Sequence, residues 1–160
     1  MPITPYHVGP GVLLKAVAPR AVSLTAFIGA NVVIDVESVV NLLTGRFPVH
    51  ATLHTFGAAL GVGLLVGGLV AWTGRRVRRR GPEWATGPAF LGGALGGLSH
   101  PLLDGIMHGD IRPFLPLTPD NPLYRVVGLD VLHGACVVAG VVGAGVLAWR
   151  RWGWAASDRG

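Results

Sequence analysis

The chain has 160 residues, of which 51% are hydrophobic and 13% are charged. A soluble domain of this length needs more charge on its surface, so the composition excludes an ordinary soluble protein and indicates one compact membrane domain. The formal net charge of +5 does not indicate nucleic-acid binding, because the basic residues stand in short clusters beside apolar runs and there set orientation in a membrane. The single cysteine, Cys136, excludes an intrachain disulfide.

Several apolar runs approach or reach the roughly 20 residues that cross a bilayer as a helix. They predict an all-α fold: a single domain over residues 1–160, built as a polytopic integral-membrane helical bundle with four to five transmembrane helices. The first run is short and carries Lys15, which predicts a marginal or half-inserted span. The predicted spans cover residues 4–18, 21–43, 54–73, 84–107 and 129–149.

Glycines in the third predicted span have the spacing of helix-packing motifs. Gly57 and Gly61 form one Gly-x-x-x-Gly pair, and Gly63 and Gly67 form another. Small residues four apart let two helix backbones approach closely in a membrane. We therefore predict a packing role for both pairs rather than a chemical one.

The stretch Ser99–His108 carries the clearest chemical pattern of the chain. It closes a run, residues 84–103, that contains no Asp, Glu, Lys or Arg and is long enough to cross a bilayer as a helix. Residues four apart share a helix face, so His100, Asp104 and His108 would form a ladder of two imidazoles and a carboxylate. Ionisable groups deep in an apolar span usually face a protein interior or a watery cavity for a functional reason. The alternative is a capped helix end with His108 in the membrane interface.

Two carboxylates, Asp35 and Glu37, lie more than halfway along the second predicted span. Because they are two residues apart, they point to different sides of a helix. A site that used both would need a local irregularity or a wide shape. Asn31 shares a face with Asp35. The alternative to a functional role is hydrogen bonding between helices.

The remaining histidines lie near the ends of predicted spans. His50 and His54 are four apart and would share a face if their segment is helical. His7 falls in the first turn of the first predicted helix, and His133 is the only interruption in the last uncharged run.

The positive-inside rule orients these spans. The arginine-rich loop at 75–80 and the basic pair at 150–151 should both be cytoplasmic. All six histidines and the buried carboxylates then fall into one layer toward the outer face of the membrane. Helix pairing would explain one or two such residues, whereas a whole layer drawn from five segments indicates a site.

Imidazole and carboxylate groups at this spacing are ligands for zinc, and also for manganese or ferrous iron. No cysteine cluster is present and the candidates outnumber four ligands, so the pattern favours an open catalytic site or two metals over a structural zinc site. Glu37 or His133 is the predicted general base, and Arg46, Arg112 or Arg125 could hold an anionic head group. The candidate metal ligands are His7, Asp35, His50, His54, His100, Asp104 and His108.

Four segments together resemble a known family. They read Thr-Pro-Tyr-His-Val-Gly-Pro-Gly, Ala-Asn-Val-Val-Ile-Asp-Val-Glu, His-Ala-Thr-Leu-His-Thr and Ser-His-Pro-Leu-Leu-Asp-Gly-Ile-Met-His-Gly-Asp-Ile-Arg-Pro-Phe. In this order, over nearly the whole chain to about residue 135, they resemble the bacterial and archaeal family of predicted membrane-bound metal-dependent hydrolases (YdjM-like). By motif, the resemblance implicates His7, Asp35, either His50 or His54, His100 and Asp104.

We therefore expect a multi-pass, metal-dependent hydrolase of a bacterial or archaeal inner membrane, with its site at the outer leaflet. His100, Asp104, Asp35 and His54 are the expected ligands of a divalent metal, with zinc first and manganese or iron as options, and His7 completes the shell. The expected partners are membrane lipid and a lipid or phosphate-bearing substrate, with no nucleic acid, and a homo-oligomer is left open.

Two alternatives belong to other classes: a small metal-ion or proton carrier, and a membrane scaffold protein whose polar layer only joins helices. A carrier should continue its polar residues through the inner half of the membrane. The sequence there is apolar and rich in glycine, which favours the hydrolase.

Overall fold

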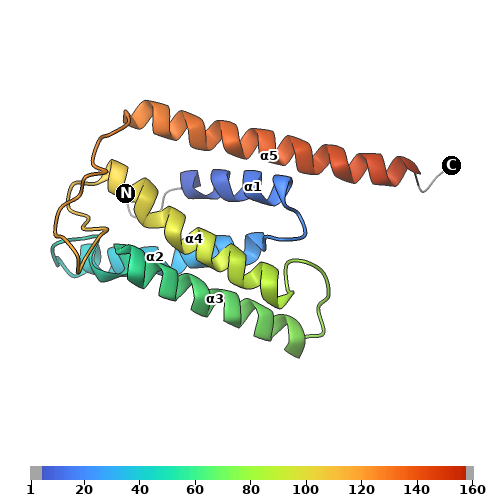
Figure 1. Ribbon diagram of the computed structural model, residues 1–160, viewed down its shortest axis with the longest axis horizontal. Helices are drawn as coiled ribbons and strands as arrows, with labels where there is room; N and C mark the ends of the chain where they lie inside the picture. The colour runs from blue at the N-terminus through green and yellow to red at the C-terminus, as the bar shows by residue number, and fades with distance from the viewer. Residues whose placement is uncertain (1–4, 158–160) are drawn as a thin grey trace.

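The computed structural model describes residues 5–157, and within them it contains helices and no strand (Figure 1). This confirms the predicted all-α class. The first predicted span starts at residue 4, which lies outside the described residues, and the helix found there has only ten residues. The elements are the 3₁₀ turn η1 Pro5–His7, α1 Val8–Val17, α2 Leu24–Leu43, the 3₁₀ turn η2 Thr52–His54, α3 Phe56–Arg76, α4 Thr86–Met107 and α5 Leu129–Ser157.

Three helices of the described part are long and apolar enough to cross a membrane: α2, α3 and the segment Leu129–Trp152 of α5. The sequence predicted a further span at 84–107. The helix α4 found there is long enough, but it is not apolar enough to join the other three. Its glycines, together with His100 and Asp104, lower its hydropathy. In Figure 1 α4 runs through the middle of the bundle, between α1 and α5 above and α2 and α3 below.

The contact between α3 and α4 is so close that only glycine and alanine fit in it. A Cβ atom added to Gly93 would collide with the backbone of Gly63, and one added to Gly97 would collide with the carbonyl of Ala59. Gly63 and Gly67 meet the backbone of α4 in the same way. The packing role predicted for the pair Gly63 and Gly67 is confirmed.

The packing role predicted for Gly57 and Gly61 is wrong. A Cβ atom added to either glycine would meet no atom within 4 Å, so both face open space. The reason is helical geometry: Gly61 and Gly63 are two residues apart, which places them about 200° apart around the helix. Only one of the two pairs can therefore face α4.

A second column of glycines on α4 meets α2. Gly93 and Gly97, which meet α3, form the first column, and Gly92 and Gly96 form the second. A Cβ atom added to Gly92 would collide with the backbone of Ser23, and one added to Gly96 would collide with the backbone of Phe27. The two columns let α4 lie directly between α2 and α3. This close packing fixes where the polar residues at the end of α4 stand relative to those of α2.

The short helix α1 packs chiefly against α5. A Cβ atom added to Gly9 would collide with the carbonyl of Cys136, and one added to Gly143 would meet the backbone of Leu13. Cys136 is buried in this contact, as a small apolar residue would be. The rest of α5 exposes large apolar side chains, which is the kind of surface that lipid covers. They include Val137, Val138, Val141, Val142 and Trp149.

An ion pair joins Lys15, in the last turn of α1, to Glu83, in the loop between α3 and α4. Lys15 Nζ also donates to the carbonyls of Pro19 at 2.9 Å and Val22 at 2.8 Å. Glu83 Oε2 accepts a 3.0 Å hydrogen bond from the backbone N–H of Thr25, in the first turn of α2, where a carboxylate is favoured. Burial raises the pKa of Glu83, but the hydrogen bonds from Lys15 and Thr25 outweigh it and hold this pKa below its ordinary value of 4.5.

We predict that Gly93→Ala destabilises the protein by about 1–3 kcal/mol, because the added methyl group overpacks a contact between two backbones. Gly61→Ala, which adds the same methyl group in open space on α3, is the matched control and should not destabilise it. Thermal unfolding of the detergent-purified variants measures both effects. Equal stability of the two variants would contradict the close contact between α3 and α4.

We also predict that Glu83 makes stability depend on pH. Because its pKa is lowered in the folded protein, its contribution is fully present above about pH 4.5 and is lost as the pH falls through the lowered pKa. Glu83→Gln should therefore be less stable than the natural protein at pH 7, and the difference should shrink on acidification. A constant difference in melting temperature from pH 7 to pH 3 would refute this.

Candidate metal centre

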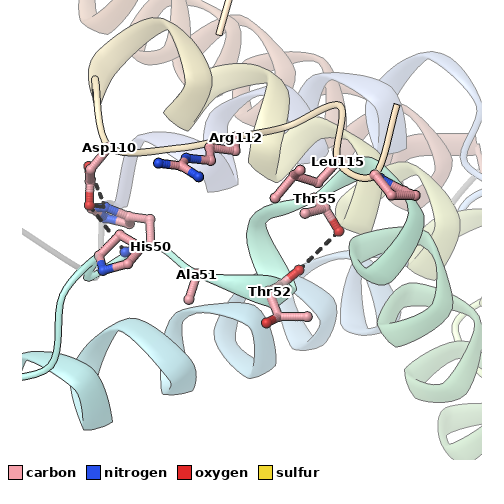
Figure 2. Close-up of a pocket in the computed structure, with 9 residues that line it drawn as sticks. His50, Ala51, Thr52, Thr55, Asp110, Arg112 and Leu115 are labelled. Atoms are coloured by element: carbon pink, nitrogen blue, oxygen red, sulfur yellow. Dashed lines mark hydrogen bonds and ion pairs between the residues drawn. The ribbon is translucent and has the colours of Figure 1, made fainter. Parts of the chain in front are cut away.

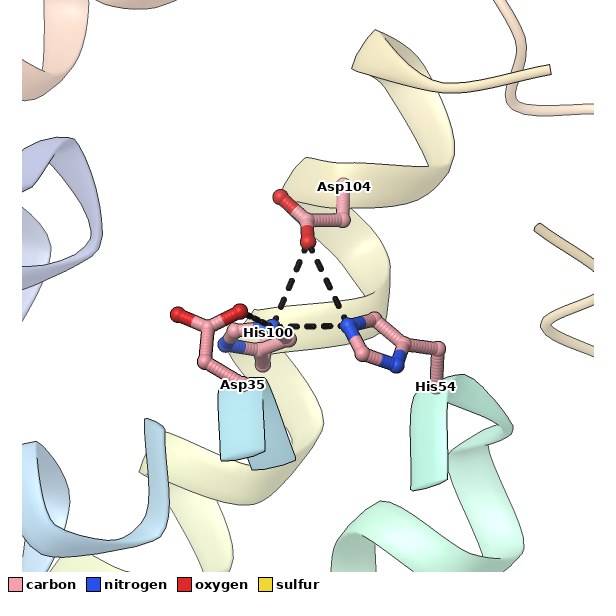
Figure 3. A group of neighbouring side chains, drawn as sticks. All are labelled: Asp35, His54, His100 and Asp104. Atoms are coloured by element: carbon pink, nitrogen blue, oxygen red, sulfur yellow. Dashed lines mark hydrogen bonds and ion pairs between the residues drawn. The ribbon is translucent and has the colours of Figure 1, made fainter. Parts of the chain in front are cut away.

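Four buried side chains from three elements converge at one end of the bundle. Asp35 comes from α2, His54 from η2, and His100 and Asp104 come from α4. Figure 3 shows donor atoms of all four directed toward one point. His54 and His100 have no exposed surface, and Asp35 and Asp104 are 5% and 3% exposed. The structure thus brings together the four residues that were expected to be the principal ligands.

The separations of these donor atoms match a metal coordination sphere. His100 Nε2 lies 3.2 Å from Asp104 Oδ2 and 3.3 Å from His54 Nε2. It also lies 3.4 Å from Asp35 Oδ1. The distance from His54 Nε2 to Asp104 Oδ2 is 3.6 Å. A metal held tetrahedrally at about 2.0–2.2 Å separates its donors by about 3.3–3.6 Å. These four separations are close to that range, and all the donor atoms lie within 4.8 Å of one another, so the group could hold a metal ion.

The charges of the group also favour a cation at its centre. Asp35 and Asp104 place two carboxylates in the interior of an apolar bundle, which is costly unless their charge is compensated. Oδ1 of Asp35 is buried and accepts no hydrogen bond. A divalent cation would balance both carboxylates and would take up this oxygen as a ligand.

Asn31 determines which nitrogen of His100 faces the other donors. Its Nδ2 donates to the carbonyl of Phe27 at 2.8 Å, which turns its Oδ1 toward Nδ1 of His100 at 3.0 Å. Nδ1–H of His100 is therefore the donor in that bond, and Nε2 of a neutral imidazole keeps its lone pair for a metal. Hydrogen bonds of this kind fix ring orientation and tautomer in metal sites.

His7, which was expected to complete the shell, contacts the group from the side of α1. Its Nε2 lies 3.1 Å from Asp104 Oδ1, the oxygen that does not face His54 and His100. Its ring stacks on that of His100, with 4.4 Å between centroids. This position suits a residue that orients Asp104 and His100 around the centre.

Glu37 binds the backbone of the neighbouring loop. Its two carboxylate oxygens accept hydrogen bonds from the N–H of Thr52 at 3.0 Å and of Leu53 at 2.7 Å. Oε2 also lies 3.6 Å from Nδ1 of His54. Glu37 thus positions η2 while Asp35 faces the other three donors, so one regular helix serves both carboxylates. Its predicted role as a general base stays a prediction.

A second group of three potential ligands, His50, His108 and Asp110, lies beside the first. His50 Nδ1 is 3.1 Å from each carboxylate oxygen of Asp110, and the ring of His50 stacks on His108 with centroids 4.3 Å apart. The ring of His50 also meets that of His54 edge-on, at 5.0 Å. The two predicted ligands His50 and His108 therefore meet each other here.

The electrostatics at His108 and Asp110 favour cation binding. Burial lowers the pKa of His108, and the nearby His50 lowers it further, so His108 is neutral at pH 7. Burial raises the pKa of Asp110, but its hydrogen bond with His50 outweighs burial and holds this pKa below its ordinary value. Asp110 is therefore ionised.

A pocket of about 450 Å³ opens beside the second group (Figure 2). His50 and Asp110 line it together with Arg112 from the loop that follows α4. Of the three arginines considered for an anionic head group, only Arg112 lines this pocket. The guanidinium of Arg125 lies instead over the ring of Tyr124, 5.4 Å from its centroid.

His133 stands apart from both groups. Its ring stacks on Tyr6 with a centroid distance of 4.2 Å, and its Nε2 lies 3.3 Å from Sδ of Met107. The structure places it near the same end of the bundle, as the predicted layer of histidines requires. Its predicted role as a general base is not tested by this placement.

Two residues of the site were not assigned a role from the sequence. Asn31 was noted only because it shares a helix face with Asp35, and its position four residues before a carboxylate gives no hint of a bond to His100. Asp110 stands two residues after His108 in the segment His-Gly-Asp-Ile-Arg-Pro. A histidine and a carboxylate this close in a loop could have marked it as a candidate ligand.

Comparison of this chain with protein-family models, with curated proteins and with solved structures finds no match. The arguments for a function therefore come from the sequence and from the geometry of the two groups.

We predict that the natural protein binds a divalent metal at the first group and that His100→Ala or Asp104→Ala removes it. Asn31→Ala should keep all four ligands but weaken the affinity about 10- to 100-fold, because His100 loses its orienting hydrogen bond. Elemental analysis of detergent-purified protein, dialysed against buffered zinc, measures each affinity. His133→Ala is the matched histidine control and should leave the metal content unchanged. Unaltered binding in both ligand variants would rule out the assignment.

Proposed function

We propose that this protein is a membrane-embedded, metal-dependent hydrolase that acts on a lipid or lipid-linked phosphate. One observation carries the proposal: Asp35, His54, His100 and Asp104 are buried, and their ligand atoms converge to within 4.8 Å of one another. Two imidazole nitrogens and two carboxylate oxygens suit zinc first, with manganese and iron as options. A metal that expanded its coordination there to a fifth position would activate a water and polarise the bond to be cleaved.

The surroundings of the site support a lipid substrate. The pocket beside the second group contains Arg112, whose guanidinium can bind a phosphate through two parallel hydrogen bonds. Phe47 and Leu117, in the loops at this end, are 83% and 89% exposed. Exposed apolar side chains beside a polar pocket are typical of a surface that meets a membrane. A phosphate on a lipid would reach the pocket from that surface.

The distribution of buried polar residues favours a hydrolase over a carrier. On α2, the buried residues that follow Ser23 toward the site are Ala26, Phe27 and Ala30, and the next buried polar side chain is that of Asn31. On α4 the corresponding turns are the two glycine columns. Within the described residues, the polar cluster therefore does not continue as a path along the bundle, as a carrier for ions would require.

The same proposal has three further parts. We propose that the chain belongs to the YdjM-like family, that it lies in an inner membrane, and that its site faces outward. The arginine-rich turn after α3 lies at the end of the bundle opposite the site (Figure 1). If that turn is cytoplasmic, as the positive-inside rule requires, the site lies toward the outer leaflet.

We expect the purified protein to cleave a phospholipid or a polyprenyl-type phosphate in mixed micelles. A chelator should abolish product formation, and zinc or manganese should restore it. Asp35→Asn should keep the fold, because it preserves shape, and should lose most of the turnover, because it removes ligand charge. Asp120→Asn makes the same change in an exposed loop, where Asp120 bonds only Thr118, and should stay active. A lipid panel without any metal-dependent product, from protein that carries metal, would turn the proposal toward the carrier.

A further inference from the structure

The two ring nitrogens of His50 cannot both be satisfied by the side chains around them. Nδ1 faces the carboxylate of Asp110 at 3.1 Å, while Nε2 is buried and has no hydrogen-bond partner. A neutral imidazole has one N–H and one lone pair. If Nδ1 carries the proton, the lone pair of Nε2 is buried without a hydrogen-bond donor. If Nε2 carries the proton, the lone pair of Nδ1 faces the carboxylate of Asp110 and the N–H of Nε2 is buried without an acceptor. Either arrangement costs free energy that a bound cation would recover.

The loop that brings the other two donors to His50 is held firmly. His108 directly follows α4, and its carbonyl accepts a 3.1 Å hydrogen bond from Nδ2 of Asn121. The same Nδ2 donates to the carbonyl of Gly105 at 2.9 Å. The backbone N–H of His50 lies 3.3 Å from Oδ2 of Asp110. These bonds fix the three donors, whose ligand atoms all lie within 4.8 Å of one another.

The second group differs from the first in number of donors and in access. The first has four protein donors, all buried. The second has three, and both His50 and Asp110 line the pocket that contains Arg112. Sites with four protein ligands are typically closed, whereas sites with three leave one position for water or substrate. The open position would face the pocket.

We propose that His50, His108 and Asp110 hold a second divalent cation whose remaining coordination position opens onto the pocket, where a phosphate oxygen of the substrate binds between this cation and Arg112. The cation site stands on its own geometry. The identification of the phosphate as part of a substrate rests on the proposed function.

The stoichiometry of bound metal tests the cation site. Detergent-purified protein, equilibrated with zinc and freed of excess metal, should contain two ions per chain by elemental analysis. His108→Ala and Asp110→Asn should each contain one, because each loses a ligand of the second group only. His100→Ala should lose the other ion, and His133→Ala should keep both. Size-exclusion profiles and helical circular dichroism identify any variant that fails to fold, and Asp110→Asn preserves the shape of the loop if His108→Ala does not.

The response to inorganic phosphate tests the open position. In protein loaded with Co²⁺, phosphate should change the visible absorption bands of the natural protein and leave those of His108→Ala unchanged. Arg112→Gln should weaken the phosphate response by roughly tenfold, the effect of losing a charged hydrogen bond. Arg125→Gln, which changes an arginine outside the pocket, should respond like the natural protein.

The outcomes separate this inference from the proposed function. One ion per chain, lost in His100→Ala and retained in His108→Ala, overturns the second site and leaves the proposed hydrolase intact. Two ions without any spectral response to phosphate overturn the open position. No bound metal in the natural protein overturns the proposed function as well.

Discussion

The structure depends on one electrostatic constraint: two carboxylates, Asp35 and Asp104, are buried among apolar helices. Their charge must be compensated where they lie, because water is excluded from both. The surrounding contacts are arranged for this purpose. Asn31 fixes the tautomer of His100, and His7 holds the oxygen of Asp104 that faces away from the other donors. A divalent cation bound between the two carboxylates would complete this compensation, because without it two like charges lie close together.

The helix α4 reconciles this polar centre with a membrane bundle. Its two glycine columns bring it against α2 and α3, and its last turns carry His100 and Asp104 to Asp35 of α2 and His54 of η2. A helix enclosed in this way does not need an apolar outer surface. The same enclosure explains why α4 fails as a membrane span by hydropathy while it remains central to the fold.

The sequence predicted the helical class, the four converging donors, and the boundaries of α2, α3 and α4 to within about three residues; α5 continues to Ser157, beyond its predicted end at residue 149. Periodicity was sufficient for His100 and Asp104, because they lie on one α-helix where spacing determines the face. It did not apply to His50 and His54, since only Thr52–His54 of that segment is helical, as the 3₁₀ turn η2. It failed for Gly57 and Gly61, since spacing alone does not tell which face of α3 meets a neighbour. It could not reach Asp110 or the bond between Asn31 and His100, because both depend on how a loop and two distant helices fold against each other.

The pairing of α1 with α5 gives the last helix an indirect hold on the metal centre. His7 precedes α1, and α1 packs chiefly against α5. The four residues of the first group come from α2, η2 and α4, so α5 supplies none of them. A change in α5 that displaced α1 would therefore withdraw His7 from Asp104 while Asp35, His54, His100 and Asp104 stayed together.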